Sequence, residues 1–248
     1  MKKSLIRLII TFIFLITFVI FNIYQGKLNN RIPNHIVTHE NVIEEIETPT
    51  IDYKEELNKL KEEYNNDDIV GVLSLENTTF SEIVMQYSDN DYYLEHTVYH
   101  KYNWRGQTFL DYRLDINDSK KLIIYGHNSP NYILPFKVFE NYYDSNYLSD
   151  HKYMYLQTDK EVKVYEIFSV YIEVSDWEYY SKVNFNTENE YFRHISDFKN
   201  KSFYDTGVEI TKYDEILIIQ TCSTHKDYTN YENKFLLVMG KRVEQFDK

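Results

Sequence analysis

A run of alternating side chains at residues 160–174 constrains the fold most strongly. The run reads KEVKVYEIFSVYIEV. One face of it carries Val162, Val164, Phe168, Val170, Ile172 and Val174, and the other carries Lys163, Tyr165, Ser169, Tyr171 and Glu173. Alternation with a period of two is typical of a β-strand that buries one face. The run therefore predicts one long, half-buried strand.

Shorter apolar runs predict further strands, and two segments predict helices. The strand candidates cover 69–76, 107–113, 121–126, 215–220 and 234–243. Apolar residues recur at helical spacing in 53–64 and again in 187–200, where Thr187 and Glu190 can form a capping box. Many short strands interrupted by a helix favour a mostly β fold, either an antiparallel barrel or a sandwich, decorated with helices.

The N-terminal region predicts a membrane anchor. Residues 8–24 carry no charge, and about 17 to 25 such residues can span a bilayer as a helix. Lys2, Lys3 and Arg7 precede this stretch, so we expect a cytoplasmic tip and the rest of the chain outside the cell. A cleavable signal peptide is the alternative, although its apolar region is usually shorter and ends at small residues. We expect residues 1–24 to form the tip and anchor, 25–50 a stalk, and 51–248 one domain.

The charge and the cysteine content exclude several classes of protein. The formal net charge is −12 and no long basic run follows the first residues, which argues against a nucleic-acid partner. One cysteine cannot form an internal disulfide, and the histidines are not spaced as zinc ligands. The acidic residues at 89–91 lack the glycine and glutamate of a calcium loop. We therefore expect no bound metal or other cofactor.

Cys222, the single thiol, stands where an apolar run ends and polar residues follow. A buried, inert cysteine is the ordinary alternative. A nucleophilic cysteine needs a base, because the thiolate is the attacking form. His127 also follows an apolar run and a glycine, so neighbouring strands would bring the two side chains together. His225 is a weaker candidate because a base only three residues away is rarely placed correctly. We expect His96, His100, His151 and His194 to be solvated.

Four segments together resemble one enzyme family. They are YGHN (125–128), QTC (220–222), the stretch 69–96 that contains DNDYYL, and GQTFLDYR (106–113). In this order they are similar to the signatures of class B sortases, membrane-anchored cysteine transpeptidases of Gram-positive bacteria. The likeness extends from the 53–64 helix to the C-terminus. It implies an eight-stranded sortase barrel with N-terminal helices, and 187–200 matches the inserted helix of this class.

The resemblance also implies a reaction and its partners. Cys222 would attack the threonine carbonyl of a C-terminal sorting signal of the NPxTG type and form a thioester, while His127 protonates the departing amine. An amine of a peptidoglycan precursor would then resolve the thioester. The partners would be surface proteins that carry the signal, the peptidoglycan amine and the membrane.

The chain departs from the family at one position. Sortases use an arginine after the cysteine loop to stabilise the oxyanion or hold the substrate. An alignment without gaps puts Phe235 there, and we expect Lys234, turned inward by a bulge, to replace the arginine. Lys226 and Arg242 are weaker substitutes. Lysine lacks the planar fork of arginine, so the exchange is not conservative.

Residues beside the catalytic pair are candidates for binding the substrate. They are Asn128, Thr221 and Asp227, although turn formation is an equally good explanation for Asn128 and a better one for Asp227. Two other functions stay open. One is an inactive relative that binds sorting signals or wall components, and the other is an unrelated cysteine hydrolase or a structural wall protein.

Overall fold

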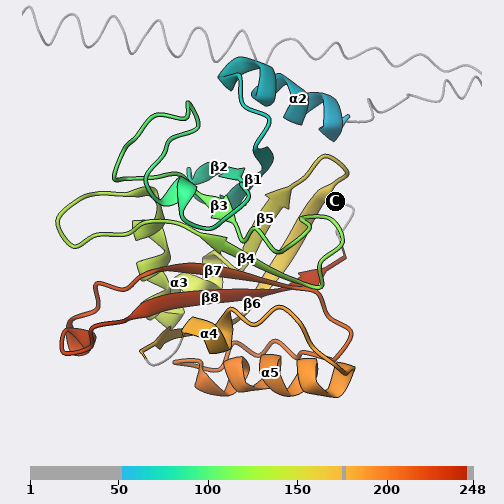
Figure 1. Cartoon of the computed structure of the whole chain (residues 1–248). Helices are drawn as coiled ribbons and strands as arrows, with labels where there is room; N and C mark the ends of the chain where they lie inside the picture. Colours follow the sequence, from blue (N-terminus) through green and yellow to red (C-terminus); the bar gives the residue numbers. More distant parts are fainter. Residues whose placement is uncertain (1–51, 175–176, 245–248) are drawn as a thin grey trace, which may run out of the picture. The chain divides into compact units, whose positions relative to one another are not determined.

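The computed structural model describes residues 52–174 and 177–244, whose strands close into an eight-stranded barrel (Figure 1). The strand order around it is β1-β2-β3-β4-β7-β8-β6-β5. The strands are β1 Ile69–Leu75, β2 Ser81–Met85, β3 Phe109–Leu110, β4 Lys121–Tyr125, β5 Tyr153–Gln157, β6 Val162–Glu173, β7 Ile216–Cys222 and β8 Phe235–Val243. Most neighbours are antiparallel, but β4 runs parallel to β7 and β2 to β3. The predicted barrel is therefore confirmed for the described residues.

Helices decorate this barrel. The α-helices described are α2 Tyr53–Tyr64, α3 Ser145–Asp150, α4 Trp177–Tyr180 and α5 Glu188–Lys201, and the 3-10 helices are η1 Tyr92–Leu94, η2 Pro135–Tyr143 and η3 Lys226–Tyr228. Both predicted helices are thus present as α2 and α5. The Thr187 hydroxyl caps α5 by accepting from the Glu190 amide, but Glu190 itself accepts from the Asn186 amide, so only half of the capping box forms.

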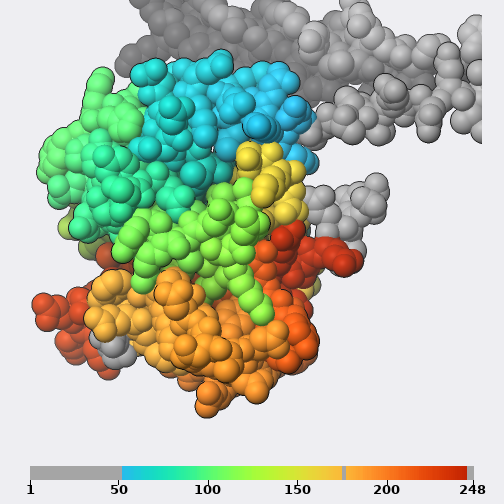
Figure 2. Space-filling view, turned by 45° about the vertical axis from the view of Figure 1, so that its right-hand side comes forward, coloured from blue at the N-terminus to red at the C-terminus, as the bar shows by residue number. Residues whose placement is uncertain are grey.

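The two predicted helices lie on different parts of the barrel. α2 buries Leu57 and packs against β1, whereas α5 packs against β6. In the space-filling view, α2 (blue) and α5 (orange) cover opposite ends of the visible face (Figure 2). Phe198 of α5 is fully buried, and Phe192, expected on the same stripe, is 37% exposed.

β6 does not keep the single alternating pattern that its sequence predicts. In its first half Lys163, Tyr165 and Ile167 are buried, while the alternating residues Val162, Val164 and Glu166 are only partly covered. The register with β8 shifts between Ile167 and Ser169, so a bulge exchanges the two faces. Beyond it the outward Ser169 hydroxyl donates to the Phe198 carbonyl of α5 at 2.7 Å. The second half is consequently buried on both faces.

Other strand predictions differ in extent. The run 107–113 forms only β3, Phe109–Leu110, because the next residue, Asp111, turns the chain by accepting from the Arg113 amide and side chain. The strands β2 and β5 were not predicted. The strand β7 continues two residues past Gln220, which makes Cys222 its last residue.

The predicted anchor (1–24) and stalk (25–50) lie outside the described residues. Within 52–174 and 177–244, no helix is long and apolar enough to cross a membrane.

The ion pair between Lys163 and Glu215 gives a test of the barrel's packing. The Lys163 side chain is fully buried, and its Nζ lies 2.9 Å from Glu215, which also accepts from Tyr165 and Arg242. Replacing Glu215→Gln leaves a buried charge without its counter-ion, so we expect the free energy of unfolding to fall by about 3 kcal/mol. Urea unfolding measures this. Asp118→Asn breaks an exposed pair with Lys160 and should change stability little, and equal effects of both variants would contradict the prediction.

Candidate active site

The parallel strands β4 and β7 place Cys222 and His127 at the same edge of the barrel. Tyr125, the last residue of β4, is paired with Gln220 of β7. The Gly126 amide donates to the Gln220 carbonyl at 3.2 Å, and the Thr221 hydroxyl donates to the Gly126 carbonyl at 2.7 Å. The end of β7 and the residue after β4 are therefore held together by hydrogen bonds, as the positions of the two apolar runs predicted.

Gly126 is needed for space. A Cβ at this position would lie 2.4 Å from the ring of Phe136, a buried residue of η2. The φ of Gly126 is not positive, so no left-handed turn requires a glycine here. The close approach of η2 to the end of β4 therefore explains this glycine.

Cys222 is exposed to solvent, but its thiol has a raised pKa. The residue is exposed, yet the protein around the sulfur raises its pKa through burial. The positive charge of Lys234 opposes this effect and lowers the pKa. The resting state is thus mainly the thiol, and attack requires a base that takes its proton.

His127 has a fixed orientation. Its Nε2 lies 2.9 Å from the carbonyl oxygen of Leu94, at the end of η1. A carbonyl only accepts, so Nε2 carries the proton in the neutral ring and Nδ1 is left as the basic nitrogen. His127 also lines a cavity of about 270 Å³ together with Glu82 and Arg105. No site residue was predicted at 89–94, although the DNDYYL motif of this segment carried part of the resemblance.

Comparison with known proteins decides the family. No family model matches the chain. Sortase B of Listeria monocytogenes is 32% identical over 180 residues, which cover 72% of this chain and 71% of that protein. Sortase B of Staphylococcus aureus is 26% identical over 180 residues, covering 72% of each. The chain belongs to the sortase B family.

Solved structures agree with this assignment. Clostridium perfringens sortase B has a TM-score of 0.68 and 27% identity, covering 75% of this chain and 100% of the other. Bacillus anthracis sortase B in complex with AAEK1 has a TM-score of 0.66 and 26% identity, covering 76% and 84%. The protein is therefore a cysteine transpeptidase of the sortase family, as its four sequence segments indicated.

Lys234 is the candidate for the missing arginine whose charge acts on the thiol of Cys222. Its carbonyl accepts from the Ser223 amide at 2.8 Å, and the next residue, Phe235, is paired with Cys222. Arg242 lies near the end of β8, beside the first residues of β7 and far along that strand from Cys222. There it forms ion pairs with Glu215 and Glu161. Lys226 is exposed in η3.

The three candidate substrate-binding residues occupy different positions. Thr221 is buried, and its hydroxyl is engaged by the Gly126 carbonyl. Asn128 is also buried, and its amide donates to the Cys222 carbonyl at 3.0 Å. Asp227 is exposed in η3, and its amide donates to Nδ1 of His225 at 3.3 Å. His225 therefore caps η3, and the first two residues hold the backbone of the site.

The expectation that His194 is solvated was wrong. It lies on the buried face of α5, and its Nε2 is 2.9 Å from Nζ of Lys121, which also donates to the carbonyls of Tyr180 and Lys182. Burial, followed by the charge of Lys121, lowers the pKa of His194 to about 2. His194 is thus a neutral packing residue.

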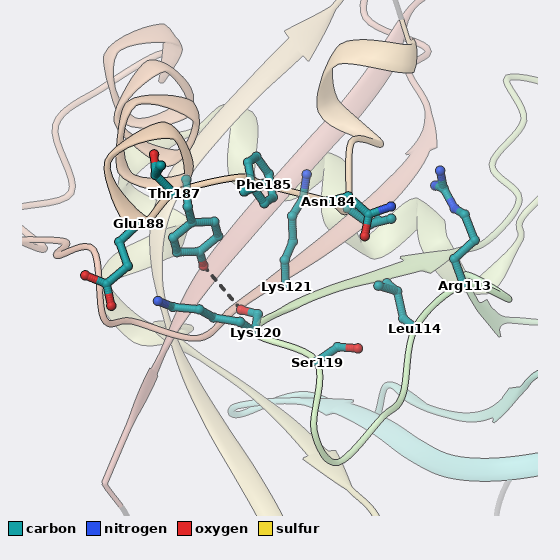
Figure 3. Close-up of a pocket in the computed structure, with 11 residues that line it drawn as sticks. Arg113, Leu114, Ser119, Lys120, Lys121, Asn184, Phe185, Thr187 and Glu188 are labelled. Carbon is teal, nitrogen blue, oxygen red and sulfur yellow. Dashed lines mark hydrogen bonds between the residues drawn. The ribbon is translucent and has the colours of Figure 1, made fainter.

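Lys121 also lines a second cavity, of about 390 Å³, at the start of α5 (Figure 3). There Glu188 and Thr187 lie at the start of the helix, and the Tyr191 hydroxyl donates to the Lys120 carbonyl at 3.2 Å. This cavity includes neither Cys222 nor His127. Within the described residues, no three His, Cys, Asp or Glu side chains gather as metal ligands.

The raised pKa of Cys222 predicts how its alkylation depends on pH. We expect the rate with iodoacetamide to keep rising between about pH 7 and 9, because only the thiolate reacts. Lys234→Met removes the charge that favours the thiolate, so it should shift the profile to higher pH. The exposed Lys226→Met is the matched control and should leave the profile unchanged. Coincident Lys234→Met and wild-type profiles would contradict the assignment of Lys234.

Proposed function

We propose that this sortase cleaves a C-terminal sorting signal of the NPxTG type and transfers the protein that carries it to a peptidoglycan amine. The observation that carries the proposal is the placement of Cys222 at the end of β7 and of His127 just beyond the end of the paired parallel strand β4, with the two strand ends joined by hydrogen bonds from Thr221 and Asn128. Distant parts of the chain thereby supply a nucleophile and a base to one edge.

Cys222 acts as the nucleophile. His127 takes the thiol proton at Nδ1, and the sulfur attacks the threonine carbonyl of the signal. Collapse of the tetrahedral intermediate forms the thioester, while the departing amine receives the proton from His127. The acceptor amine then gives a proton to His127, attacks the thioester and regenerates the thiol.

Lys234 stabilises the negative charge that develops on the carbonyl oxygen. Its ammonium already acts on the sulfur of Cys222, so it lies on the side of the site where this charge forms. Asn128 and Thr221 hold the strand ends and affect the substrate only through Cys222 and Gly126. Asp227, exposed beyond the nucleophile, is the candidate for direct contact with the signal peptide.

The N-terminal sequence gives the proposal its location. Residues 8–24 would cross the membrane, with residues 1–7 in the cytoplasm, and residues 25–50 would hold the catalytic domain away from the lipid. The domain would then meet both membrane-bound surface proteins and the peptidoglycan precursor on the outer side. This matches the resemblance to the membrane-anchored sortases.

Trapping of the thioester tests the proposed reaction. We expect residues 51–248, incubated with an NPxTG peptide, to give a mass adduct at Cys222, and added triglycine to release it as a transfer product. Cys222→Ala should give no adduct. Peptide binding without an adduct in the wild-type protein would instead favour the inactive relative, and cleavage without transfer to any amine would favour a hydrolase.

Substitution of the base gives a second test. His127→Ala should slow formation of the thioester by about 10²- to 10⁴-fold, because general acid and base catalysis is lost. His225→Ala is the matched control, since His225 is near Cys222 in the sequence but caps η3. Single-turnover measurements distinguish the two. A larger loss in His225→Ala than in His127→Ala would refute the role of His127.

A further inference from the structure

We propose that Glu140 is a positioning residue that sets the geometry of Cys222 relative to His127. This inference rests on the proposed function above. Glu140 lies in η2, outside every segment that carries the family resemblance, and its side chain is only 11% exposed.

The carboxylate of Glu140 is fully engaged. Oε1 accepts from the Asn128 side chain at 2.8 Å and from the Thr224 amide at 2.6 Å. Oε2 accepts from the Thr224 hydroxyl at 2.8 Å and from Nζ of Lys137. Lys137 closes the cluster by donating to the same hydroxyl at 2.7 Å. A buried group with this many donors has a defined position.

The donors lie next to the two reacting side chains. Asn128 follows His127 directly, and the same amide group that binds Glu140 also donates to the Cys222 carbonyl at 3.0 Å. Thr224 lies two residues beyond Cys222. One carboxylate thus fixes the residue after the base and the loop after the nucleophile, which come from distant parts of the chain. A change in Glu140 would move one segment relative to the other.

The charge state suits this role. Burial alone would raise the pKa of Glu140, but the hydrogen bonds from Lys137 and Thr224 outweigh it and lower the pKa below its usual value. Glu140 is therefore ionised at neutral pH and accepts from all four donors. The links are lost when pH falls through this lowered pKa, because a protonated carboxyl has to donate at one oxygen.

The helix η2 has other supports. Phe136 and Phe139 are buried in the core, and the Tyr142 hydroxyl donates to the His151 carbonyl at 2.8 Å. Tyr143 is linked to the Ser223 hydroxyl at 2.8 Å. The helix therefore keeps its place without the carboxylate, and the loss of Glu140 should alter the loop after Cys222 more than it alters folding.

Glu140→Gln is the test, since it keeps the size of the side chain but replaces one acceptor oxygen by a donor. In the full chain in detergent, we expect kcat for cleavage of an NPxTG peptide to fall by about 10- to 100-fold while KM stays within about twofold. Glu215→Gln is the matched control, because it removes a half-buried, multiply bonded carboxylate at the opposite end of β7. At temperatures where both variants are folded, its kcat should stay near the wild-type value.

Hydrogen exchange provides a readout that needs no substrate. Glu140→Gln should accelerate exchange of the amides at 222–225, and Glu215→Gln should not. If the kcat of Glu140→Gln equals that of the wild-type protein, the inference is overturned even if hydrogen exchange increases, because Glu140 would then have only a structural role. If the wild-type protein shows no activity, the proposed function fails. In that case, exchange at 222–225 that is the same in Glu140→Gln and in the wild-type protein would separately overturn the positioning role.

Discussion

The parallel pairing of β4 with β7 is the constraint on which the active site depends. In an antiparallel pair, two strands end at opposite edges, whereas a parallel pair brings both carboxyl ends to one edge. Five residue pairs, from Lys121 with Ile216 to Tyr125 with Gln220, fix the register. Every residue of β4 is buried, so a slip by one position would reverse the side chains of a strand that has no exposed face. The separation of the nucleophile from the base is thereby set by core packing.

The sequence predicted the parts of the barrel that are buried most completely. The strands β4, β7 and β8 are continuous apolar runs, because both of their faces are covered over much of their length. β5 was missed since its outward residues, Tyr153 and Tyr155, are half-buried tyrosines and give no polar contrast. β2 is only five residues long and buries two of them. In β6 the period of two was visible, but the bulge after Ile167 depends on the partner strand.

The placement of Cys222 and His127 at one edge was predictable from the strand ends, whereas contacts between distant segments of the candidate site were not. Cys222 and His127 each follow an apolar run, which is a local signal. Glu140 has none, because its partners Asn128 and Thr224 come from other segments of the chain. His194 does have a local signal of burial in the sequence, because it lies one helical turn before Phe198 and therefore on the buried stripe of α5. Its polar neighbours along the chain face the other side of the helix.

The proposed replacement of the family arginine by Lys234 is compatible with catalysis on electrostatic grounds. Negative charge moves during the reaction from the sulfur of Cys222 to the carbonyl oxygen of the substrate, a distance of about two bonds. Lys234 is held through its backbone by Ser223, while its side chain keeps rotatable bonds and a compact charge. Such a charge can follow the negative centre without a planar partner. Under the proposed mechanism, burial keeps the thiol protonated at rest, so the lysine would act chiefly on the transition state, where charge has already formed and His127 holds the proton.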